Sequence, residues 1–408
     1  MGNTQLREQN WRRQAIRLTL KGLRPCDILE RIPRSRPWLL KWQKRFTTLG
    51  WTGLQGQARR PAKSPQQDPA QTRALVRRVR QSLEKRAVGL IGAREVRREL
   101  ARQHRVPTMP GLTTIKRWLR QAGLGPAKES PPSAVWYPEP SFAPSFVLQA
   151  MDWTARYLEG GEKVFAFHTV EAQTRALAQT LRTDKSTASV RRHAVQVWQT
   201  LGLPTGLQLD NDSAFTGGEK TARRFGEFVR LCLYLGIEPV FTPPGEPKRN
   251  WWVEGLNGLW AQSFWERQHF HSVAEVVRKS RKFVQWYLSQ YSPPALSGLT
   301  PAQARRGLKR QRLTPRQLRV LPEGLPITAG RLHFIRKVSP EGTIRILGER
   351  WKVAKGWVHQ YVWATVVTHC RRLEIYPRRS ERATTRLIKV YDYEIPEPVR
   401  RLRLEYKR

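Results

Sequence analysis

The chain has 408 residues, of which 74 are Lys or Arg and 32 are Asp or Glu, giving a formal net charge of +42. This excess of positive charge exceeds what solubility requires and indicates a polyanionic partner such as nucleic acid. The three cysteines lie far apart in the sequence, which excludes a disulfide framework and a zinc motif and suits a reducing cytoplasm. No apolar run approaches the ~20 residues of a membrane-spanning helix, so we expect no membrane partner.

The positive charge is concentrated at the two ends of the chain. Residues 1–125 contain 29 basic and 7 acidic side chains, and residues 291–408 contain 26 and 9. Residues 146–290 are nearly balanced, with 18 basic and 14 acidic side chains. We therefore expect the flanks to hold nucleic acid and the middle to use its carboxylates for another purpose.

Residues 1–52 are predicted to form a helix-turn-helix domain. Apolar residues recur at helical spacing between residues 10 and 49, which predicts three short helices, and Ser35 can cap the third. A helix of this kind fits the major groove of DNA. The alternative is an ordinary three-helix bundle with a solvated basic face. The third helix would offer DNA its basic residues Arg36, Lys41, Lys44 and Arg45.

Residues 53–69 are rich in Gly, Gln and Pro, which is typical of a flexible linker. Two of its arginines are expected to contact DNA, Arg59 and Arg60.

Residues 70–125 are predicted to form a second helix-turn-helix-like domain, with self-association as the alternative role. Its helices are expected near residues 70–86, 93–103 and 113–123. The last helix would direct three basic residues outward, Lys116, Arg117 and Arg120. Residues 126–145 contain six prolines, which favours a semi-rigid spacer.

Residues 146–290 alternate between strand and helix patterns, which predicts a central α/β domain. Apolar runs predict one strand that ends at Asp152 and another that ends at Asp210, with a hairpin at residues 159–162. Right-handed crossovers would set these two strands parallel and adjacent, so the two carboxylates become neighbours. Further elements are expected at residues 175–181, 186–201, 219–235, 238–242 and 273–287.

A third acid, Glu254, lies near the start of a helix that Asn250 can cap. The core-facing stripe of that helix leaves Glu254 and Asn257 on one flank, where they can point toward the strand ends. Three carboxylates in an apolar setting repel one another unless cations neutralise them, and oxygen ligands of this kind suit a pair of Mg²⁺ ions. For any single acid, the alternative is a surface charge or a helix cap. The core stripe comprises Val253, Leu256, Trp260 and Phe264.

Taken in order, these motifs resemble bacterial insertion-sequence transposases, whose catalytic core is similar to retroviral integrase and RNase H. The resemblance implies that Asp152, Asp210 and Glu254 form a DDE triad that binds two Mg²⁺ ions, with Mn²⁺ as a substitute. It also implies a prokaryotic, nucleoid-associated protein. The supporting residues are Asp152, Asp210-Asn211 with Phe215, Thr242-Pro243-Pro244, Asn250 with Val253-Glu254 and Asn257, and Leu299-Thr300-Pro301-Ala302.

Three features depart from the family pattern. Asp212 stands where Gly is common, and could distort or supplement the metal site. Glu254 follows Asp210 by 44 residues, a long interval that indicates an insertion near residues 216–224. Trp251 and Trp252 replace smaller residues, and we expect them to be core or wall residues first and base-stacking residues second.

Residues 243–249 are predicted to form a loop over the metal ions, in which Lys248 and Arg249 contact phosphates; an exposed turn with incidental charge is the alternative. Four histidines are expected to be surface or hydrogen-bonded polar residues without acid-base roles: His168, His193, His269 and His271.

The chain is therefore predicted to be a multidomain protein, with N-terminal all-α domains and a central RNase H-like α/β core. Residues 291–326 would form a basic connector with a short helix near Ala302. Residues 327–376 show short alternating runs that predict a small β-barrel, and residues 377–408 would form a basic tail.

The expected function is that of a DNA transposase or integrase that cleaves mobile-element ends and joins them to a target. Double-stranded DNA and a homo-oligomer on DNA are the expected partners. The alternatives are a catalytically inactive or domesticated DNA-binding regulator, and a nuclease that hydrolyses without strand transfer.

Overall fold

The computed structural model divides into two compact units, Met1–Thr72 and Arg73–Arg408. No helix in the described ranges is long and apolar enough to span a membrane. The structure describes residues 3–55, 70–103, 106, 108–124, 137, 146–217, 223–377 and 387–407.

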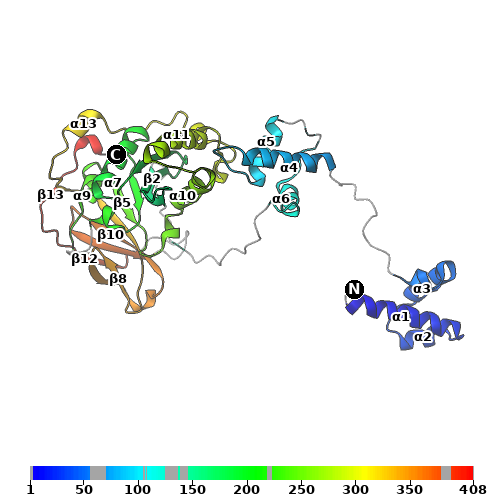
Figure 1. Cartoon of the computed structure of the whole chain (residues 1–408). Coiled ribbons are helices and arrows are strands. Elements are labelled where there is room, and N and C mark those ends of the chain that lie inside the picture. Colours follow the sequence, from blue (N-terminus) through cyan, green and yellow to red (C-terminus); the bar gives the residue numbers. More distant parts are fainter. Residues whose placement is uncertain are drawn as a thin grey trace. The chain divides into compact units, whose positions relative to one another are not determined.

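The first unit is built from three helices around a small apolar core (Figure 1). Its helices bury four residues in one cluster, Ala15, Ile28, Ile32 and Leu39. Ser35 occupies the position before the third helix, but its side chain makes no capping hydrogen bond. The elements are α1 (Asn3–Leu20), α2 (Pro25–Arg31), α3 (Arg36–Leu49) and the short η1 (Gly50–Leu54).

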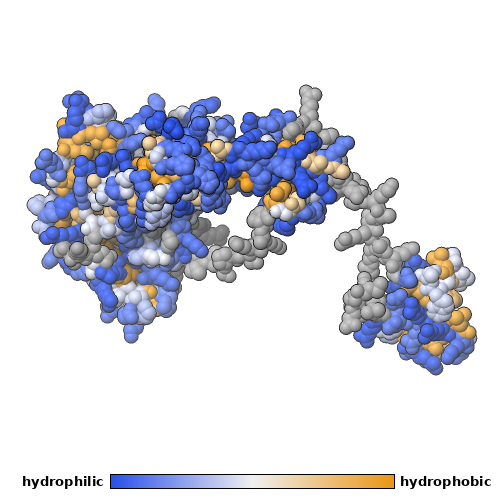
Figure 2. Space-filling view, in the orientation of Figure 1, coloured by the Kyte–Doolittle hydropathy of each residue, from blue (hydrophilic) through white to orange (hydrophobic). Residues whose placement is uncertain are grey.

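A second helical bundle is formed by α4 (Ala70–Glu84), α5 (Ala93–Gln103) and α6 (Leu112–Gln121). Apolar side chains from all three helices meet in one cluster, and the visible outer face is mainly hydrophilic (Figure 2). The bundle is held against the central domain because the guanidinium of Arg267 donates hydrogen bonds to backbone carbonyls at the end of α4. The acceptors include Leu83 and Glu84, each at 2.9 Å, and Gly89 at 3.0 Å.

The central domain is organised around a sheet of nine strands in the order β12-β11-β10-β7-β5-β4-β1-β2-β3. Strands β1, β2 and β3 are antiparallel, whereas β1, β4, β5 and β7 are parallel to one another. The first strands are β1 (Leu148–Tyr157), β2 (Lys163–Glu171), β3 (Leu177–Arg182), β4 (Gly206–Leu209) and β5 (Glu238–Phe241).

Helices cover both faces of this sheet, because successive side chains of a strand point to opposite faces (Figure 1). In β2, Phe165 and Phe167 pack with α7 and α9, whereas Val164 and Ala166 pack with α10 and α11. The helices are α7 (Thr187–Thr200), α8 (Ser213–Thr216), α9 (Glu227–Tyr234), α10 (Trp251–Ser263) and α11 (Val273–Ser289).

The C-terminal strands extend the core sheet, so the small β-barrel predicted over residues 327–376 is not confirmed as a separate domain. The strands expected there are present, but β7 pairs with β5 in parallel, with Val240 opposite His333. This pairing satisfies backbone groups that the edge strand β5 would otherwise expose. The strands are β6 (Ile327–Thr328), β7 (Arg331–Lys337), β8 (Thr343–Ile346), β9 (Glu349–Lys352), β10 (Tyr361–Val367), β11 (Arg372–Pro377), β12 (Lys389–Asp392) and β13 (Val399–Arg400).

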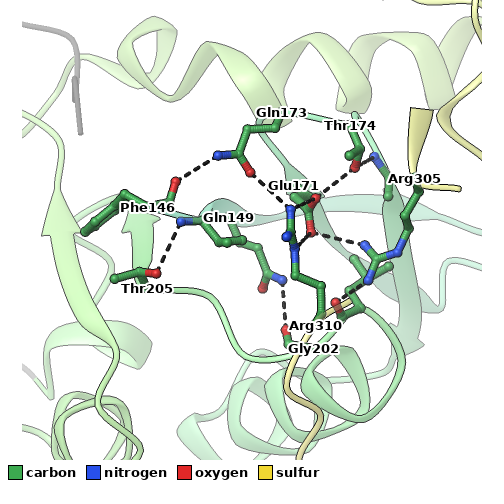
Figure 3. A network of polar contacts seen from close by, with 12 residues as sticks. Phe146, Gln149, Glu171, Gln173, Thr174, Gly202, Thr205, Arg305 and Arg310 are labelled. Carbon is green, nitrogen blue, oxygen red and sulfur yellow. Dashed lines mark hydrogen bonds and ion pairs between the residues drawn. The ribbon is translucent and has the colours of Figure 1, made fainter. Parts of the chain in front are cut away.

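The connector between core and C-terminal strands is fixed by a buried carboxylate (Figure 3). Glu171, fully buried at the end of β2, receives hydrogen bonds from Arg305 and Arg310, each at 3.1 Å, and from Thr174 at 3.0 Å. The two positively charged guanidinium groups therefore neutralise this carboxylate inside the fold. The connector contains α12 (Pro301–Ala304) and α13 (Pro315–Arg319).

Candidate active site

Asp152 and Asp210 lie on neighbouring parallel strands. In the pairing of β1 with β4, Ala150 is opposite Gln208, and the same register continued by two residues sets Asp152 opposite Asp210. Asp210 directly follows β4, as predicted. Asp152 lies in the middle of β1 and not at its end, because the strand continues to Tyr157 as one arm of the hairpin with β2.

Glu254 lies in the first turn of α10, whose predicted core residues are all buried: Val253, Leu256, Trp260 and Phe264. Burial, together with the carboxylates of Asp210 and Glu254, raises the pKa of Asp152 to about 7. Burial also raises the pKa of Asp210; the hydrogen bond from the backbone N–H of Asp212 opposes this rise, and the charge of the Asp212 carboxylate adds a smaller one. Burial likewise raises the pKa of Glu254. The three acids therefore come from separate elements, and the charges of Asp210 and Glu254 disfavour ionisation of Asp152.

Asn250 precedes α10, but its side chain does not cap the helix, which corrects the sequence prediction. It is buried and bonds instead to the two acid-bearing strands. Its Oδ1 accepts from Gln208 Nε2 at 2.9 Å, and its Nδ2 donates to the carbonyl of Met151 at 3.3 Å. Asn250 therefore ties the start of the Glu254 helix to the backbone beside Asp152.

A chain of polar side chains orients Asp152. Asn257 Nδ2 donates to Asp152 Oδ2 at 3.0 Å, and Asn257 Oδ1 lies 2.6 Å from His168 Nδ1. The other ring nitrogen of His168 lies 2.7 Å from Gln179 Nε2. Burial lowers the pKa of His168 to about 4, so the ring is neutral, and this order of donors requires its proton on Nδ1. His168 is thus a buried, hydrogen-bonded residue.

Asp212 is engaged by neighbouring groups and does not point freely toward the other acids. Its Oδ2 forms an ion pair with Lys185 at 2.8 Å, and its Oδ1 accepts from the backbone N–H of Ala214 at 2.9 Å at the start of α8. The backbone N–H of Asp212 donates to Asp210 Oδ1 at 3.0 Å. This extra acid shapes the turn after β4, and its backbone holds Asp210.

Arg336, a buried residue of β7, supports the same turn from the C-terminal strands. Its guanidinium donates to Asn211 Oδ1 at 2.8 Å and to the carbonyl of Thr242 at 2.9 Å. Asn211 Nδ2 also donates to the carbonyl of Thr242, at 2.6 Å. Sequence reasoning missed Arg336, and no sequence signal links it to a residue 125 positions earlier.

The two basic residues predicted to contact phosphates differ in their surroundings. Lys248 is exposed and lies near enough to Glu254 to lower its pKa against the larger effect of burial. Arg249 instead pairs with Glu246 at 3.0 Å, and its guanidinium lies 4.4 Å and 5.1 Å from the ring centroids of Tyr137 and Tyr361. Because Arg249 makes these contacts within the protein, Lys248 is the more accessible of the two basic residues.

The other predicted DNA-contact residues lie on helix surfaces or outside the described ranges. Arg36, Lys41 and Lys44 are exposed on α3, and Arg45 is half-buried with its guanidinium over the Trp42 ring. The basic residues of α6 are exposed: Lys116, Arg117 and Arg120. Arg59, Arg60 and part of the predicted insertion at residues 216–224 lie outside the described residues.

The remaining histidines have structural partners. His193 is buried between Thr169 and Thr180, at 2.9 Å and 2.8 Å. His269 and His271 are exposed, and both pair with Glu159.

The donor set at the three acids suits a hard divalent cation, because it consists of carboxylate oxygens whose mutual repulsion a cation would relieve. Within the described ranges, no basic side chain forms an ion pair with Asp152, although Lys185 pairs with the adjacent Asp212. In the same ranges, no group of three or more His, Cys, Asp or Glu side chains is already gathered around one metal position. The two aspartates are thus paired by register, and Glu254 lies on the adjoining helix turn.

No protein-family model matches the chain. The Gag-Pro-Pol polyprotein of Simian retrovirus SRV-2 is 25% identical over 171 residues, which is 41% of this chain and 8% of the polyprotein. The chain thus spans a small part of that relative's length.

Two solved integrase cores and one intasome are similar to parts of the chain. The catalytic core domain of HTLV-2 integrase in complex with magnesium has a TM-score of 0.29 and 18% identity over 38% of this chain and 94% of that one. The catalytic core of BIV integrase has a TM-score of 0.28 and 18% identity over 38% and 90%. A simian T-cell lymphotropic virus intasome in complex with PP2A regulatory subunit B56 gamma has a TM-score of 0.35 and 14% identity over 75% and 96%.

The polyprotein and the integrase cores to which the chain is similar are retroviral proteins.

Proposed function

We propose that the chain is a DDE-type DNA transposase or integrase, which cleaves the ends of a mobile element and joins them to target DNA. One observation carries the proposal: Asp152, Asp210 and Glu254 come from three elements, and their burial and mutual repulsion raise the pKa of Asp152 to about 7. Such an arrangement is costly for the fold and is typical of a functional site.

The three acids would hold two Mg²⁺ ions, or Mn²⁺ ions, with Asp152 and Asp210 sharing the first and Glu254 completing the second. Bound there, the ions would supply an activated attacking oxygen and charge stabilisation for the leaving oxygen of the phosphodiester.

The protein's own residues would prepare this chemistry by fixing the acids. Asn257 donates to Asp152 and so favours its ionised form, while the backbone of Asp212 does the same for Asp210. Asn250 fixes the first turn of α10, and with it Glu254, to the strands. The exposed ammonium of Lys248 would contact a phosphate beside the scissile bond.

The flanking basic regions would bind double-stranded DNA. In this proposal α3 enters the major groove with Arg36, Lys41 and Lys44, and α6 contacts a second segment through its exposed basic residues. Two element ends must be brought together before joining, so a homo-oligomer on DNA is expected.

Joining of a labelled duplex end to a second duplex in Mg²⁺ tests this function. We expect the wild type to form joined products and Asp210→Asn to lose at least about a thousand-fold in rate, because several kcal/mol of charge stabilisation depend on the carboxylate. Glu162→Gln, which neutralises an exposed acid in the β1–β2 hairpin, is the matched control and should retain most of the activity. Equal joining by wild type and Asp210→Asn would contradict the proposal.

A DNA-binding regulator is the second candidate, favoured by Asp212 and the long interval from Asp210 to Glu254, which depart from the family pattern. It predicts DNA binding without joined or hydrolysed products. Hydrolysed products without joined ones would identify the nuclease alternative.

A further inference from the structure

Two tryptophans form an exposed aromatic stack at the start of α10. The rings of Trp251 and Trp252 lie with their centroids 3.7 Å apart and an interplanar angle of 25°. Trp251 is 40% exposed, which places it among the exposed large apolar residues of the chain. Trp251 is therefore not a core residue, which leaves the predicted alternatives of a wall residue and a base-stacking residue. The exposed face of the stacked rings is therefore available to a ligand.

Arg175 supports the stack from the turn between β2 and β3. Its guanidinium lies 3.8 Å from the Trp252 ring centroid and 5.2 Å from that of Trp251. Arg175 adopts a left-handed backbone conformation, with φ of 58°, which is uncommon for a residue with a side chain. The strained backbone of Arg175 thus places its guanidinium next to the rings of Trp251 and Trp252.

The stack is fixed close to the acids. Trp251 precedes Glu254 by three helical residues, or about 4.5 Å along the axis. Asn250, the residue before Trp251, is bonded to both acid-bearing strands. Lys248, three residues earlier than Trp251, is exposed and lies near Glu254. A DNA strand that reaches the acids would therefore meet an aromatic surface and positive charge together.

We propose that Trp251, supported by Trp252 and Arg175, stacks against an unpaired base of the DNA strand held at the acids. The inference rests on the proposed function and adds a binding subsite to it. A ring face with nearby cations suits a nucleobase joined to phosphate, because the base stacks while the phosphate is attracted by Arg175 and Lys248. Stacking also tolerates any base, so this subsite needs no sequence preference.

The test compares Trp251→Leu, which keeps apolar character, with Trp251→Phe, which keeps an aromatic face. The probes are a blunt duplex and the same duplex with a short single-stranded tail that carries the fluorescent adenine analogue 2-aminopurine. Stacking contributes about 1 to 3 kcal/mol per base, so Trp251→Leu should weaken binding of the tailed duplex by about 5- to 150-fold relative to wild type. Trp251→Phe should recover most of this loss, and binding of the blunt duplex should not change.

The fluorescence gives a local readout on the full-length protein. We expect quenching of 2-aminopurine with wild type and Trp251→Phe, and little quenching with Trp251→Leu. Equal weakening for both duplexes, or a change in the oligomeric state of Trp251→Leu without DNA, would overturn the proposal in favour of a contact between copies of the chain. Wild type that joins ends without quenching the probe would overturn the stacking subsite alone. Wild type that binds duplexes but never joins or cuts them would overturn the proposed function.

Discussion

A fully buried acid and a partly buried acid on the same sheet have opposite surroundings. Glu171, at the end of β2, is fully buried and receives two guanidinium groups and a hydroxyl. Asp152, on the neighbouring strand β1, faces two further carboxylates and is held by the amide of Asn257. The first acid is neutralised within the protein, whereas the second is oriented but left without a basic partner in the described residues.

Glu171 stabilises the fold, whereas Asp152 would bind a cation in the proposed function. Pairing with arginines makes Glu171 a clamp between the sheet and the connector (Figure 3). An amide donor can orient Asp152 without neutralising it, so its charge remains available to an external cation. Substitutions at the two positions should therefore change stability in opposite directions.

The largest change in stability is expected from breaking the Glu171 clamp. Glu171→Ala leaves Arg305 and Arg310 without their shared carboxylate, and loss of one partner of a buried pair costs about 3 to 5 kcal/mol. Urea denaturation at neutral pH would measure this loss of unfolding free energy. Glu159→Ala, which removes a half-exposed acid at the β1–β2 hairpin, is the control and should change stability little. A loss below about 1 kcal/mol would show that the clamp is not a stabilising element.

Asn257→Leu should reduce joining while the protein remains folded. This substitution removes the donor to Asp152, and loss of an orienting partner of a metal ligand typically costs about 10- to 100-fold in activity or metal affinity. Asn257→Gln keeps the amide but displaces it, and should be intermediate. Single-turnover joining at several Mg²⁺ concentrations provides the measurement, and unchanged rates would show that Asp152 needs no orientation.

Arg336→Lys should reduce joining by about 10-fold, because an ammonium cannot reproduce the paired donors to Asn211 and Thr242. The effect should fall on the rate of joining and not on the affinity for duplex DNA, since Arg336 lies beneath the turn that carries Asp210. Arg223→Lys, in a partly exposed ion pair with Glu349, is the matched control. A loss confined to DNA affinity would contradict a positioning role for Arg336.

Asp152→Asn should stabilise the protein by about 1 to 2 kcal/mol at pH 7 while abolishing joining. Because the folded-state pKa of about 7 lies above the ordinary 3.8, the folded protein holds a proton that the unfolded chain loses between these values. Stability of the wild type should therefore fall relative to the variant as pH rises from about 4 to about 7. If the unfolding free energies of the wild type and Asp152→Asn changed with pH in the same way across this range, the sign of the pKa shift would be contradicted.

The sequence predicts the local elements of this fold well, because the periods of apolar residues are local properties. The strands before Asp210 and after residue 327, and the core stripe of α10, are found where the periodicity indicates. The pairing of β7 with β5 could not be predicted, because an edge strand can pair with any strand that reaches it.

In the candidate site too, local features could be predicted from the sequence and tertiary contacts could not. The three acids could be chosen from the sequence, since each follows or lies within an apolar pattern. The side-chain partners could not, because they depend on tertiary contacts. Asn250 satisfies the rule for a helix cap yet bonds to Gln208 and Met151, and Arg336 reaches Asn211 only because β7 joins the core sheet.

Diffraction from crystals soaked in Mn²⁺, recorded near the manganese absorption edge, tests the central claim most directly. The account predicts anomalous peaks beside Asp152 and Asp210, with a second ion toward Glu254 about 3.5 to 4 Å away when DNA is bound. These peaks should vanish in Asp210→Asn. Peaks elsewhere, or none near the three acids at saturating Mn²⁺ with DNA bound, would contradict it.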